Sequence, residues 1–466
     1  MKRKKIVLLI PFLLLAFIFS CAKLKKSEDE KIILKVWETY NNEEHNVFLQ
    51  VIENFKKYYK EKYNKDIEII ADRVPFDALV DNIKTACLAR INPDIARVDA
   101  LKVIELAYHK VIEPLDKLPN FDAKSIEEKR KDYIEAPFNS NIIDIKGEEH
   151  LYGLPEQTTC LALFRNLDLF REKSAELKAA GLDPNKAPED WDEFIKYAKV
   201  LTDEKKNIYG FAMANSLWFT LPFFNMYKAE IIKKGPDGKK YCNITDERAI
   251  YAFQRKVDLY QKHKIEAGAW RAGAIGPDQG FINKVYAMIL IGPWMIQRFK
   301  DSGINYAVSL IPKPTKQDAI KLKLIPENAT DEEYHKEITT STNIGGNNLV
   351  IFRNSKYKEV AYEFINYVTG KENQIFWSKS LGQIPINLKA YDVIMADTAV
   401  IPEIKIFMQQ LLFAKVPPLV PLYGLMESDI VNPEMALALK GDKTVEQAFK
   451  DAAIKIEQEI LKQVNE

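Results

Sequence analysis

Two kinds of segment alternate along the first part of the chain. Apolar runs rich in β-branched residues occupy 32–37 and 66–71. Between them, over 45–60, apolar residues recur every three or four positions, which places them on one face of a helix. Strand, helix and strand in this order predict a βαβ unit, with its two strands parallel and a right-handed crossover between them.

The same alternation continues to the end of the chain. It predicts helices over 78–90, 103–109, 191–198, 249–262, 360–368, 373–380 and 444–464. It predicts further strands over 95–98, 160–164, 287–291, 306–311 and 349–352. Strands that alternate with helices indicate α/β architecture, in which ligands bind at the ends of strands. The 466 residues suffice for two or three ordinary domains.

One stretch, 285–314, combines a predicted strand with a conspicuous aromatic residue. The apolar run 287–291 is stopped by Gly292-Pro293, and Trp294 begins a predicted helical turn. A tryptophan on a turn just beyond a strand is well placed to line a cleft, since loops at strand ends carry ligands. The alternative is a core tryptophan beside a turn.

The first residues read as an export signal. A basic start, 2–5, is followed by an apolar run, 6–20, too short for an ordinary membrane span. The run ends in Ile-Phe-Ser-Cys, which resembles the motif of bacterial lipoproteins. We therefore expect a lipoprotein signal peptide over 1–20, lipid on Cys21 and a polar tether over 21–31. A plain secretory signal with an incidental cysteine is the alternative.

Composition limits the classes of function. Hydrophobic residues make up 47% and charged residues 29%, as in soluble globular proteins. The net charge of +1 gives no electrostatic reason to expect a nucleic-acid partner. Beyond Cys21, the cysteines are Cys87, Cys160 and Cys242, which allow at most one disulfide and favour free thiols.

No pattern typical of an active site is present. The five histidines are scattered without metal-ligand spacing, and the chain has no nucleophile elbow, Walker A loop or dinucleotide-binding fingerprint. We therefore expect no metal and no cofactor. A pair of glycosidase carboxylates stays possible, because acidic residues are abundant.

Aromatic and amide-type residues do gather at predicted strand ends. Aromatic faces stack on the C–H face of a sugar ring, while amides and carboxylates hydrogen-bond its hydroxyls. For each such residue a core or surface role is the alternative. The candidate ligand-binding residues are Trp37, Glu38, Asn41, Asp99, Gln157, Thr158, Trp218, Trp294, Gly345, Gly346, Asn347 and Tyr423.

Several segments, in order and spacing, resemble the extracellular solute-binding proteins of ABC importers, in the class that includes the maltose- and maltodextrin-binding proteins. The resemblance covers nearly all of the chain after the tether. The segments that carry it are LKVWETYN, PDIARVDALKVIELAYHKVIEPLD, YGLPEQTTCLALFRNLDLF, APEDWDEF, YAMILIGPWMIQRF, INYAVSLIPKP, IGGNNLVIF and GDKTVEQAFKDA.

This resemblance implies two α/β lobes of the maltose-binding-like, type II periplasmic-binding-protein fold, with ligand between them and a hinge that the chain crosses three times. It places the crossings near 155–159, 311–314 and 382–385. The first lobe would comprise 32–157 with 316–380, and the second 160–312 with 384–466. Trp294 and Trp218 would occupy aromatic positions of the cleft, and Asp99 a loop that contacts sugar hydroxyls.

The implied function is a lipid-anchored, non-enzymatic binding protein that delivers a sugar or oligosaccharide to ABC permease subunits. It would be held at a bacterial membrane, facing the periplasm or the extracellular space. The chain departs from the maltose binders where they carry a glutamate, here Thr159, and a late tryptophan, here about Ser428 with Tyr423 nearby. Maltose itself is therefore not implied. The alternatives are a glycerophosphodiester or polyamine as the solute, a secreted glycoside hydrolase, and a surface adhesin.

Overall fold

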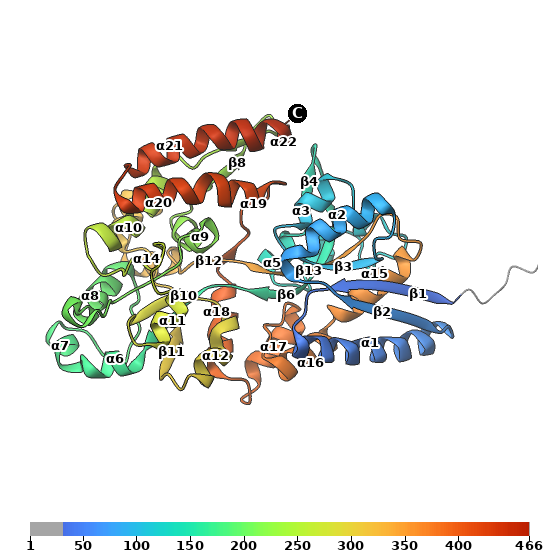
Figure 1. Ribbon diagram of the computed structural model, residues 1–466, viewed down its shortest axis with the longest axis horizontal. Coiled ribbons are helices and arrows are strands. Elements are labelled where there is room, and N and C mark those ends of the chain that lie inside the picture. The colour runs from blue at the N-terminus through green and yellow to red at the C-terminus, as the bar shows by residue number, and fades with distance from the viewer. Residues whose placement is uncertain (1–30, 466) are drawn as a thin grey trace, which may run out of the picture.

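The chain folds into two α/β lobes that lie side by side, each built on its own sheet (Figure 1). This is seen in a computed structural model that describes residues 31–465. The signal peptide over 1–20, the lipid acceptor Cys21 and the tether up to residue 30 lie outside the described residues.

A five-stranded sheet, in the order β2-β1-β3-β13-β6, forms the first lobe. Its strands are β1 (Ile32–Glu38), β2 (Ile67–Arg73), β3 (Ile95–Asp99), β6 (Gly153–Thr159) and β13 (Gly345–Ile351). β1 is parallel to β2, and α1 (Asn42–Tyr63) connects them, which confirms the predicted βαβ unit. β13 returns antiparallel between β3 and β6, so five separate segments meet in this sheet.

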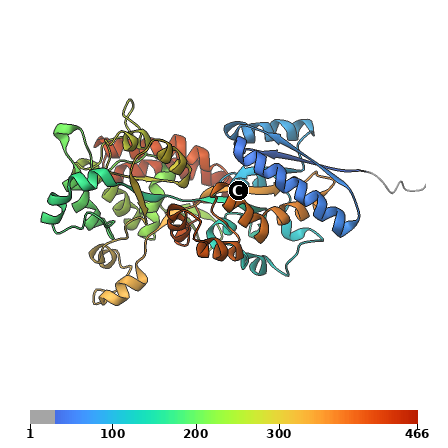
Figure 2. The same cartoon turned by 90° about the horizontal axis from the view of Figure 1, so that it is seen from below.

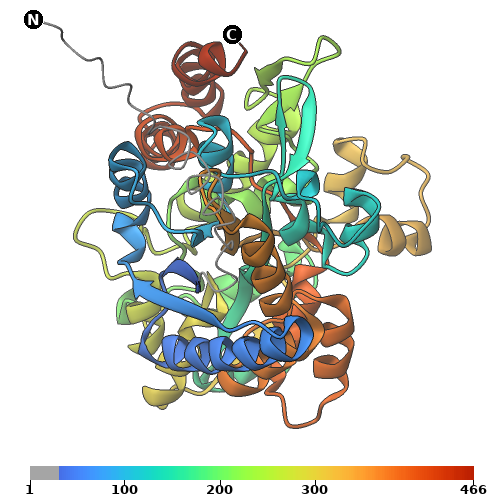
Figure 3. The same cartoon turned by 90° about the vertical axis from the view of Figure 1, so that its right-hand side faces the viewer.

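Helices cover both faces of that sheet, because successive side chains of each strand point to opposite faces and both faces are buried. Leu349 and Ile351 pack with Phe48 of α1, whereas Val350 packs with α2 (Leu79–Ala89) and α3 (Val103–Tyr108) on the other side. Viewed from the side of the first lobe, α1 and α2 lie on opposite sides of the strands (Figure 3). Strands buried on both faces are typical of α/β sheets.

Late segments complete the core on the α1 side. α15 (Lys358–Val368) and α16 (Lys371–Leu381) contribute Phe364 and Trp377, which is fully buried. Phe55 of α1 packs edge-on against Phe364, with ring centroids 5.0 Å apart. The first lobe is therefore assembled from the beginning of the chain and from residues three hundred positions later.

The second lobe is centred on an antiparallel sheet in the order β10-β7-β11. Its strands are β7 (Ala162–Asn166), β10 (Met288–Ile291) and β11 (Tyr306–Ser309). Its larger helices are α8 (Trp191–Leu201), α9 (Leu217–Met226), α10 (Glu247–Gln261), α18 (Pro402–Leu411), α20 (Asn432–Lys440) and α21 (Val445–Lys455). Asp190 caps α8, accepting hydrogen bonds from the backbone N–H of Asp192 and Glu193.

Three chain segments connect the lobes. β6 runs from the first sheet through Cys160-Leu161 into β7. β12 (Thr342–Asn343) leads directly into β13, and residues 382–387 lead from α16 to α17 (Leu388–Ala396). β12 pairs in parallel with β14 (Ala414–Lys415), and Thr158 of β6 bridges to Ile384. The connecting segments thus brace one another.

Residues 316–338 pack on the second lobe, whereas the sequence prediction assigned them to the first. α13 (Lys316–Lys321) and α14 (Asp331–Glu337) project from that lobe (Figure 2). Asp318 accepts hydrogen bonds from Tyr227 (3.0 Å) and Tyr251 (2.5 Å), both in the second lobe. The prolines that end β11 turn the chain but do not take it across. We therefore propose second-lobe boundaries of 160–343 and 384–466.

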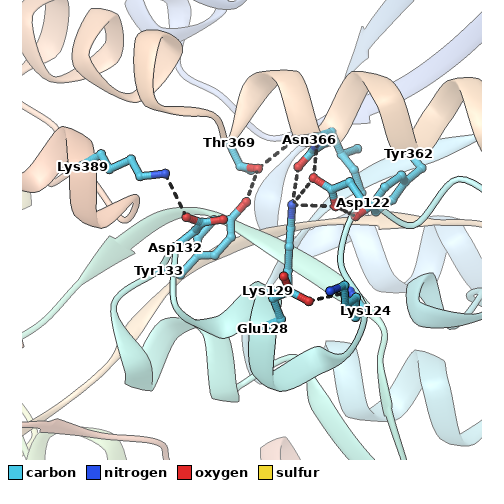
Figure 4. A network of polar contacts seen from close by, with 11 residues as sticks. Asp122, Lys124, Glu128, Lys129, Asp132, Tyr133, Tyr362, Asn366, Thr369 and Lys389 are labelled. Carbon is cyan, nitrogen blue, oxygen red and sulfur yellow. Dashed lines mark hydrogen bonds and ion pairs between the residues drawn. The ribbon is translucent and has the colours of Figure 1, made fainter.

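A buried polar network holds α4 (Ile126–Arg130) against α15 in the first lobe (Figure 4). The Lys129 ammonium donates to Asp122 (2.8 Å) and to Asn366 (2.6 Å). Burial raises the pKa of Asp122, but the hydrogen bonds and charge of Lys129 outweigh burial and hold that pKa below its usual value. The ammonium, 4% exposed, is thus compensated by an ionised carboxylate.

Candidate ligand-binding cleft

A cavity of about 1350 Å³ lies between the two lobes, and both lobes line it. The volume exceeds the range of about 300–1,000 Å³ that is usual for small-molecule sites. Most of the predicted binding residues meet here, although they come from distant parts of the sequence. They are Asn41, Asp99, Gln157, Thr158, Trp218, Trp294, Gly345, Gly346, Asn347 and Tyr423.

Two predicted residues, Trp37 and Glu38, do not line the cavity. Trp37 packs against the cluster of α2, beside Val74 and Cys87. Glu38 is fully buried beneath the loop that follows β1, and its carboxylate lies 2.6 Å from His45 Nδ1. Neither side chain lines the cavity, and of the residues between β1 and α1 only Asn41 does.

Two tryptophans of the second lobe form an aromatic corner of the cavity. Trp218, in the first turn of α9, and Trp294, beyond β10, have ring centroids 6.1 Å apart. Trp294 is 49% exposed, so its ring faces open space. Trp218 is fixed, because its Nε1 donates to the Ile344 carbonyl (3.1 Å). Trp218 is thus held in place and Trp294 is accessible, and two such neighbouring indoles suit stacking on a flat or ring-shaped ligand.

Glycines allow both indoles to lie where they do. A Cβ at Gly292 would lie 1.7 Å from the Trp294 ring, and a Cβ at Gly345 would lie 3.1 Å from the Trp218 ring. Gly346 has φ +122°, and a Cβ there would lie 2.1 Å from the Gln157 carbonyl oxygen. The glycines of the Gly-Pro-Trp and Gly-Gly sequences therefore allow the indole rings and the neighbouring strand to lie close to the backbone.

On the first-lobe side of the cavity, the buried Arg97 fixes the side chain of Gln157 by a hydrogen bond. Arg97 hydrogen-bonds Gln157 Oε1 and, through Nε, the Glu156 carboxylate (2.9 Å). Its guanidinium stacks on Tyr40 at 4.1 Å from the ring centroid. Burial raises the pKa of Glu156, and the charge of Arg97 opposes that shift. The arginine thereby presents the Gln157 amide to the cavity.

Glu44 joins three segments at the cavity wall. Its Oε2 accepts from the Asn41 backbone N–H (3.0 Å), which caps α1. Its Oε1 accepts from the side-chain amides of Gln157 (3.3 Å) and Gln383 (3.0 Å). Gln383 belongs to the third connecting segment, so this carboxylate ties the first lobe to the hinge.

Sequence reasoning did not single out Glu44, Gln383 and several other lining residues. Phe76, 51% exposed, enters from the turn after β2, and Glu427 enters from the helix that follows Tyr423. Glu44 lies in the first turn of an amphipathic helix, where acidic residues are ordinary. An exposed phenylalanine between Pro75 and an acidic residue was the one available signal.

Asp99 and Glu427 bring two carboxylates, one from each lobe, to the same region of the cavity. Burial raises the pKa of Asp99, and the negative charge of Glu427 raises it further, while Leu101 N–H and Lys102 oppose the shift. Burial also raises the pKa of Glu427, whose Oε1 accepts from Trp218 N–H at 2.8 Å. Glu427 also accepts from the Ser216 hydroxyl. Each carboxylate has further lone pairs with which it can accept from a ligand donor.

The lining of the cavity suits the binding of a polar solute. Among residues 31–465 no group of three His, Cys, Asp or Glu side chains could hold a metal ion. Cys87, Cys160 and Cys242 are free thiols, as expected, and Cys160 is fully buried. The cavity offers indole faces, amides and carboxylates, which are the groups that recognise a polar solute by stacking and hydrogen bonding.

The family model described as bacterial extracellular solute-binding protein matches residues 47–375. The chain belongs to this family. The two-lobed, maltose-binding-like fold confirms the architecture expected from the sequence. In the part of the chain that the structure describes, no helix is both long and apolar enough to span a bilayer.

Named relatives of this solute-binding protein are similar over most of their length. The galactooligosaccharide-binding protein of Bacillus subtilis (strain 168) is 25% identical over 299 residues, 62% of each chain. The sn-glycerol-3-phosphate-binding periplasmic protein of Salmonella paratyphi A is 26% identical over 340 residues, 67% of this chain and 68% of the relative. The cyclic alpha-maltosyl-1,6-maltose binding protein from Arthrobacter globiformis aligns over 91% of this chain and 98% of its own, with a TM-score of 0.72 and 19% identity.

Proposed function

We propose that this protein captures a sugar or oligosaccharide between its two lobes and delivers it, unaltered, to the permease of an ABC importer. The observation that carries the proposal is the pair formed by Trp218 and Trp294 across from the amide and carboxylate groups of the first lobe. A pyranose has one apolar C–H face and a rim of hydroxyls, and this cavity offers a partner for each.

The cavity volume supports a ligand larger than a single small solute. About 1350 Å³ is open between the lobes, with Phe76 at one wall and the two indoles at another. Aromatic side chains at separate walls suit successive rings of an oligosaccharide. The name of the Bacillus subtilis relative, a galactooligosaccharide-binding protein, is consistent with this class of ligand.

The remaining parts of the proposal come from the N-terminal residues. Lipid on Cys21 would hold the protein at a bacterial membrane, facing the periplasm or the extracellular space, with 21–31 as a tether. The permease subunits would be its protein partner. No catalytic step is proposed, and no cofactor, metal or nucleic acid is part of this function.

A phosphate-bearing solute is the alternative that the second relative suggests, and the cleft opposes it. The lining includes the carboxylates of Glu44, Asp99, Glu105 and Glu427. A phosphate would have to approach these charges in a partly desolvated cavity, where repulsion is weakly screened. A glycerophosphodiester is therefore disfavoured on electrostatic grounds.

Titration of the purified protein tests the proposal. Intrinsic tryptophan fluorescence, with calorimetry as a second readout, would be followed against neutral di- to tetrasaccharides of α and β linkage, with sn-glycerol-3-phosphate and spermidine alongside. We expect saturable binding of at least one saccharide, because Trp218 and Trp294 line the cavity. Saturable binding of only a non-sugar solute would contradict the proposal.

A further inference from the structure

The cavity carries a marked excess of negative charge. Seven acidic residues line it, but only three basic ones do, so the formal balance of the lining is 3 − 7 = −4. The whole protein, by contrast, has a net charge of +1. The acidity is therefore a property of this cleft, and a cleft lined by one sign of charge attracts ligands of the opposite sign.

The three lysines of the lining are already occupied. Lys84 lies 2.9 Å from Glu105, Lys102 lies 3.8 Å from the same carboxylate, and Lys300 lies 3.9 Å from Glu403. Lys84 also lies 3.9 Å from Asp81. Among the described residues no cation forms an ion pair with the remaining five lining carboxylates, which are those of Glu43, Glu44, Asp77, Asp99 and Glu427. Glu44 is satisfied by neutral amides.

Asp99 and Glu427 stand out among these carboxylates because they face each other from opposite lobes. Each uses one oxygen for a backbone N–H, of Leu101 (2.8 Å) and of Trp218 (2.8 Å). Lys102 is the nearest cation, and it reaches toward the second lobe, 3.2 Å from a Cβ placed on Gly424. That single ammonium stands among three carboxylates, since it also approaches Glu105.

An unpartnered hydroxyl lies at the same place. Tyr423 lines the cavity and is 3% exposed, yet its hydroxyl has no hydrogen-bond partner in the described part of the chain. Asp99 and Glu427 line the same cavity. Burial raises the pKa of Tyr423, and the charges of Glu427 and Asp99 raise it further. Asp99 thus accepts from one backbone N–H, Glu427 accepts from the Trp218 N–H and the Ser216 hydroxyl, and the Tyr423 hydroxyl has no partner among the described residues.

We propose that Asp99, Tyr423 and Glu427 form a subsite for a protonated amine, so that the ligand is an amino-substituted sugar or oligosaccharide. An ammonium donates three hydrogen bonds, which matches two carboxylates and a hydroxyl oxygen. The neighbouring Trp218, whose backbone N–H binds Glu427, adds an indole ring to which a cation is attracted. This inference rests on the proposed sugar-binding function and specifies the chemical class of the sugar.

Matched pairs of ligands test the subsite. Glucosamine-containing di- to tetrasaccharides in α-1,4 and β-1,4 linkage would be titrated calorimetrically, each beside its neutral glucose parent. We expect the aminated ligand to bind about tenfold or more tightly in at least one linkage series, the ratio that one charge-assisted hydrogen bond supplies. We also expect 0.5 M NaCl to reduce this preference, because it shortens the Debye length to about 4 Å from about 30 Å in 0.01 M salt.

Isosteric variants assign the preference to the two carboxylates. Asp99→Asn and Glu427→Gln keep an oxygen for the backbone N–H of Leu101 and Trp218 but remove the charge. Each should abolish most of the amine preference, which means that it lowers the affinity for the aminated ligand by a larger factor than the affinity for the neutral parent. Glu61→Gln, an exposed α1 position outside the cavity, is the matched control and should leave both affinities unchanged.

The outcomes separate this inference from the proposed function. If neutral saccharides bind as well as or better than their aminated partners in every series, the subsite is overturned and sugar binding stands. If the amine preference survives both variants, Asp99 and Glu427 do not recognise the amine and the assignment fails. If no saccharide binds, aminated or neutral, the proposed function fails and this inference fails with it.

Discussion

Replacing Arg97 with methionine is expected to lower the free energy of unfolding by about 3–5 kcal/mol, the usual cost of leaving one member of a buried ion pair without its partner. Arg97 is 2% and Glu156 1% exposed, and they are joined at 2.9 Å. The variant also loses the guanidinium stack on Tyr40 and the bonds to Thr39 and Gln157. Urea unfolding followed by circular dichroism measures the change.

The cost should depend on pH with a defined sign. Burial already raises the pKa of Glu156, and loss of Arg97 removes the charge that opposes this shift. A group whose folded pKa lies above its unfolded value stabilises at low pH and loses that contribution as pH rises through the folded pKa. The loss of stability in Arg97→Met should therefore be smaller at pH 5 than at pH 8, because a protonated Glu156 leaves no unpaired charge in the core.

Two companions make the result specific. Arg97→Met combined with Glu156→Gln should recover part of the stability, because no unpaired charge is left. Arg171→Met breaks a pair with Asp168 at 3.5 Å whose arginine side chain is 73% exposed, and should cost less than about 1 kcal/mol. A loss below about 1 kcal/mol for Arg97→Met itself would refute the assigned role of this pair.

Replacing Trp294 with alanine is expected to weaken saccharide binding by about 1–2 kcal/mol, or roughly five- to thirtyfold in the dissociation constant. Trp294 faces the cavity with half of its surface exposed, so the lost interaction is with the ligand more than with the core. Stability should change little for the same reason. Calorimetric titration of the saccharide identified in the fluorescence screen measures the effect.

The matched control is Tyr63→Ala. Tyr63 is also an exposed aromatic residue, at 42%, but it lies at the end of α1 and outside the cavity. It should leave the affinity unaltered, whereas Trp294→Phe should restore part of the stacking. Unchanged affinity in Trp294→Ala would remove this residue from the binding site.

The pattern of apolar residues along the chain predicted most of the regular secondary structure correctly. The strand over 287–291, the turn at Gly292-Pro293 and the helical turn after it are found as β10 (Met288–Ile291) and the short helices that follow. Strand β13 (Gly345–Ile351) begins earlier than the apolar run that predicted it, at the glycines. Hydrophobic periodicity reports burial, and glycines that pair in a sheet carry no such signal.

Tertiary placement was harder to foretell. The family resemblance placed a hinge crossing near 311–314 and so assigned residues 316–338 to the first lobe. Instead Tyr227 and Tyr251 hold Asp318 on the second lobe, and no local feature of 316–338 reveals partners so distant in sequence. Only the resemblance to a known family brought Trp218 and Trp294 to one cleft, because they lie 76 positions apart in the sequence.

The cleft residues that were missed share one cause. Glu44 and Glu427 lie on helices among other acidic residues. They line the cavity because the helical turns that carry them face the opposite lobe, which the local sequence does not reveal. The opposite error concerns Trp37 and Glu38, which were predicted to bind ligand. Trp37 packs against a core cluster of the first lobe, and Glu38 is fully buried. The direction of a side chain at a strand end depends on packing that sequence alone does not contain.

Small-angle X-ray scattering, with and without a saturating saccharide, tests most directly whether the ligand is held between the lobes. Closure of two lobes on a ligand is hinge motion, and the three connecting segments braced by β12 and β14 are its expected pivot. We predict a smaller radius of gyration with the saccharide and no change in the Trp218→Ala/Trp294→Ala double variant. A saccharide that binds tightly while the radius of gyration stays the same, or that binds equally well to the double variant, would contradict the account.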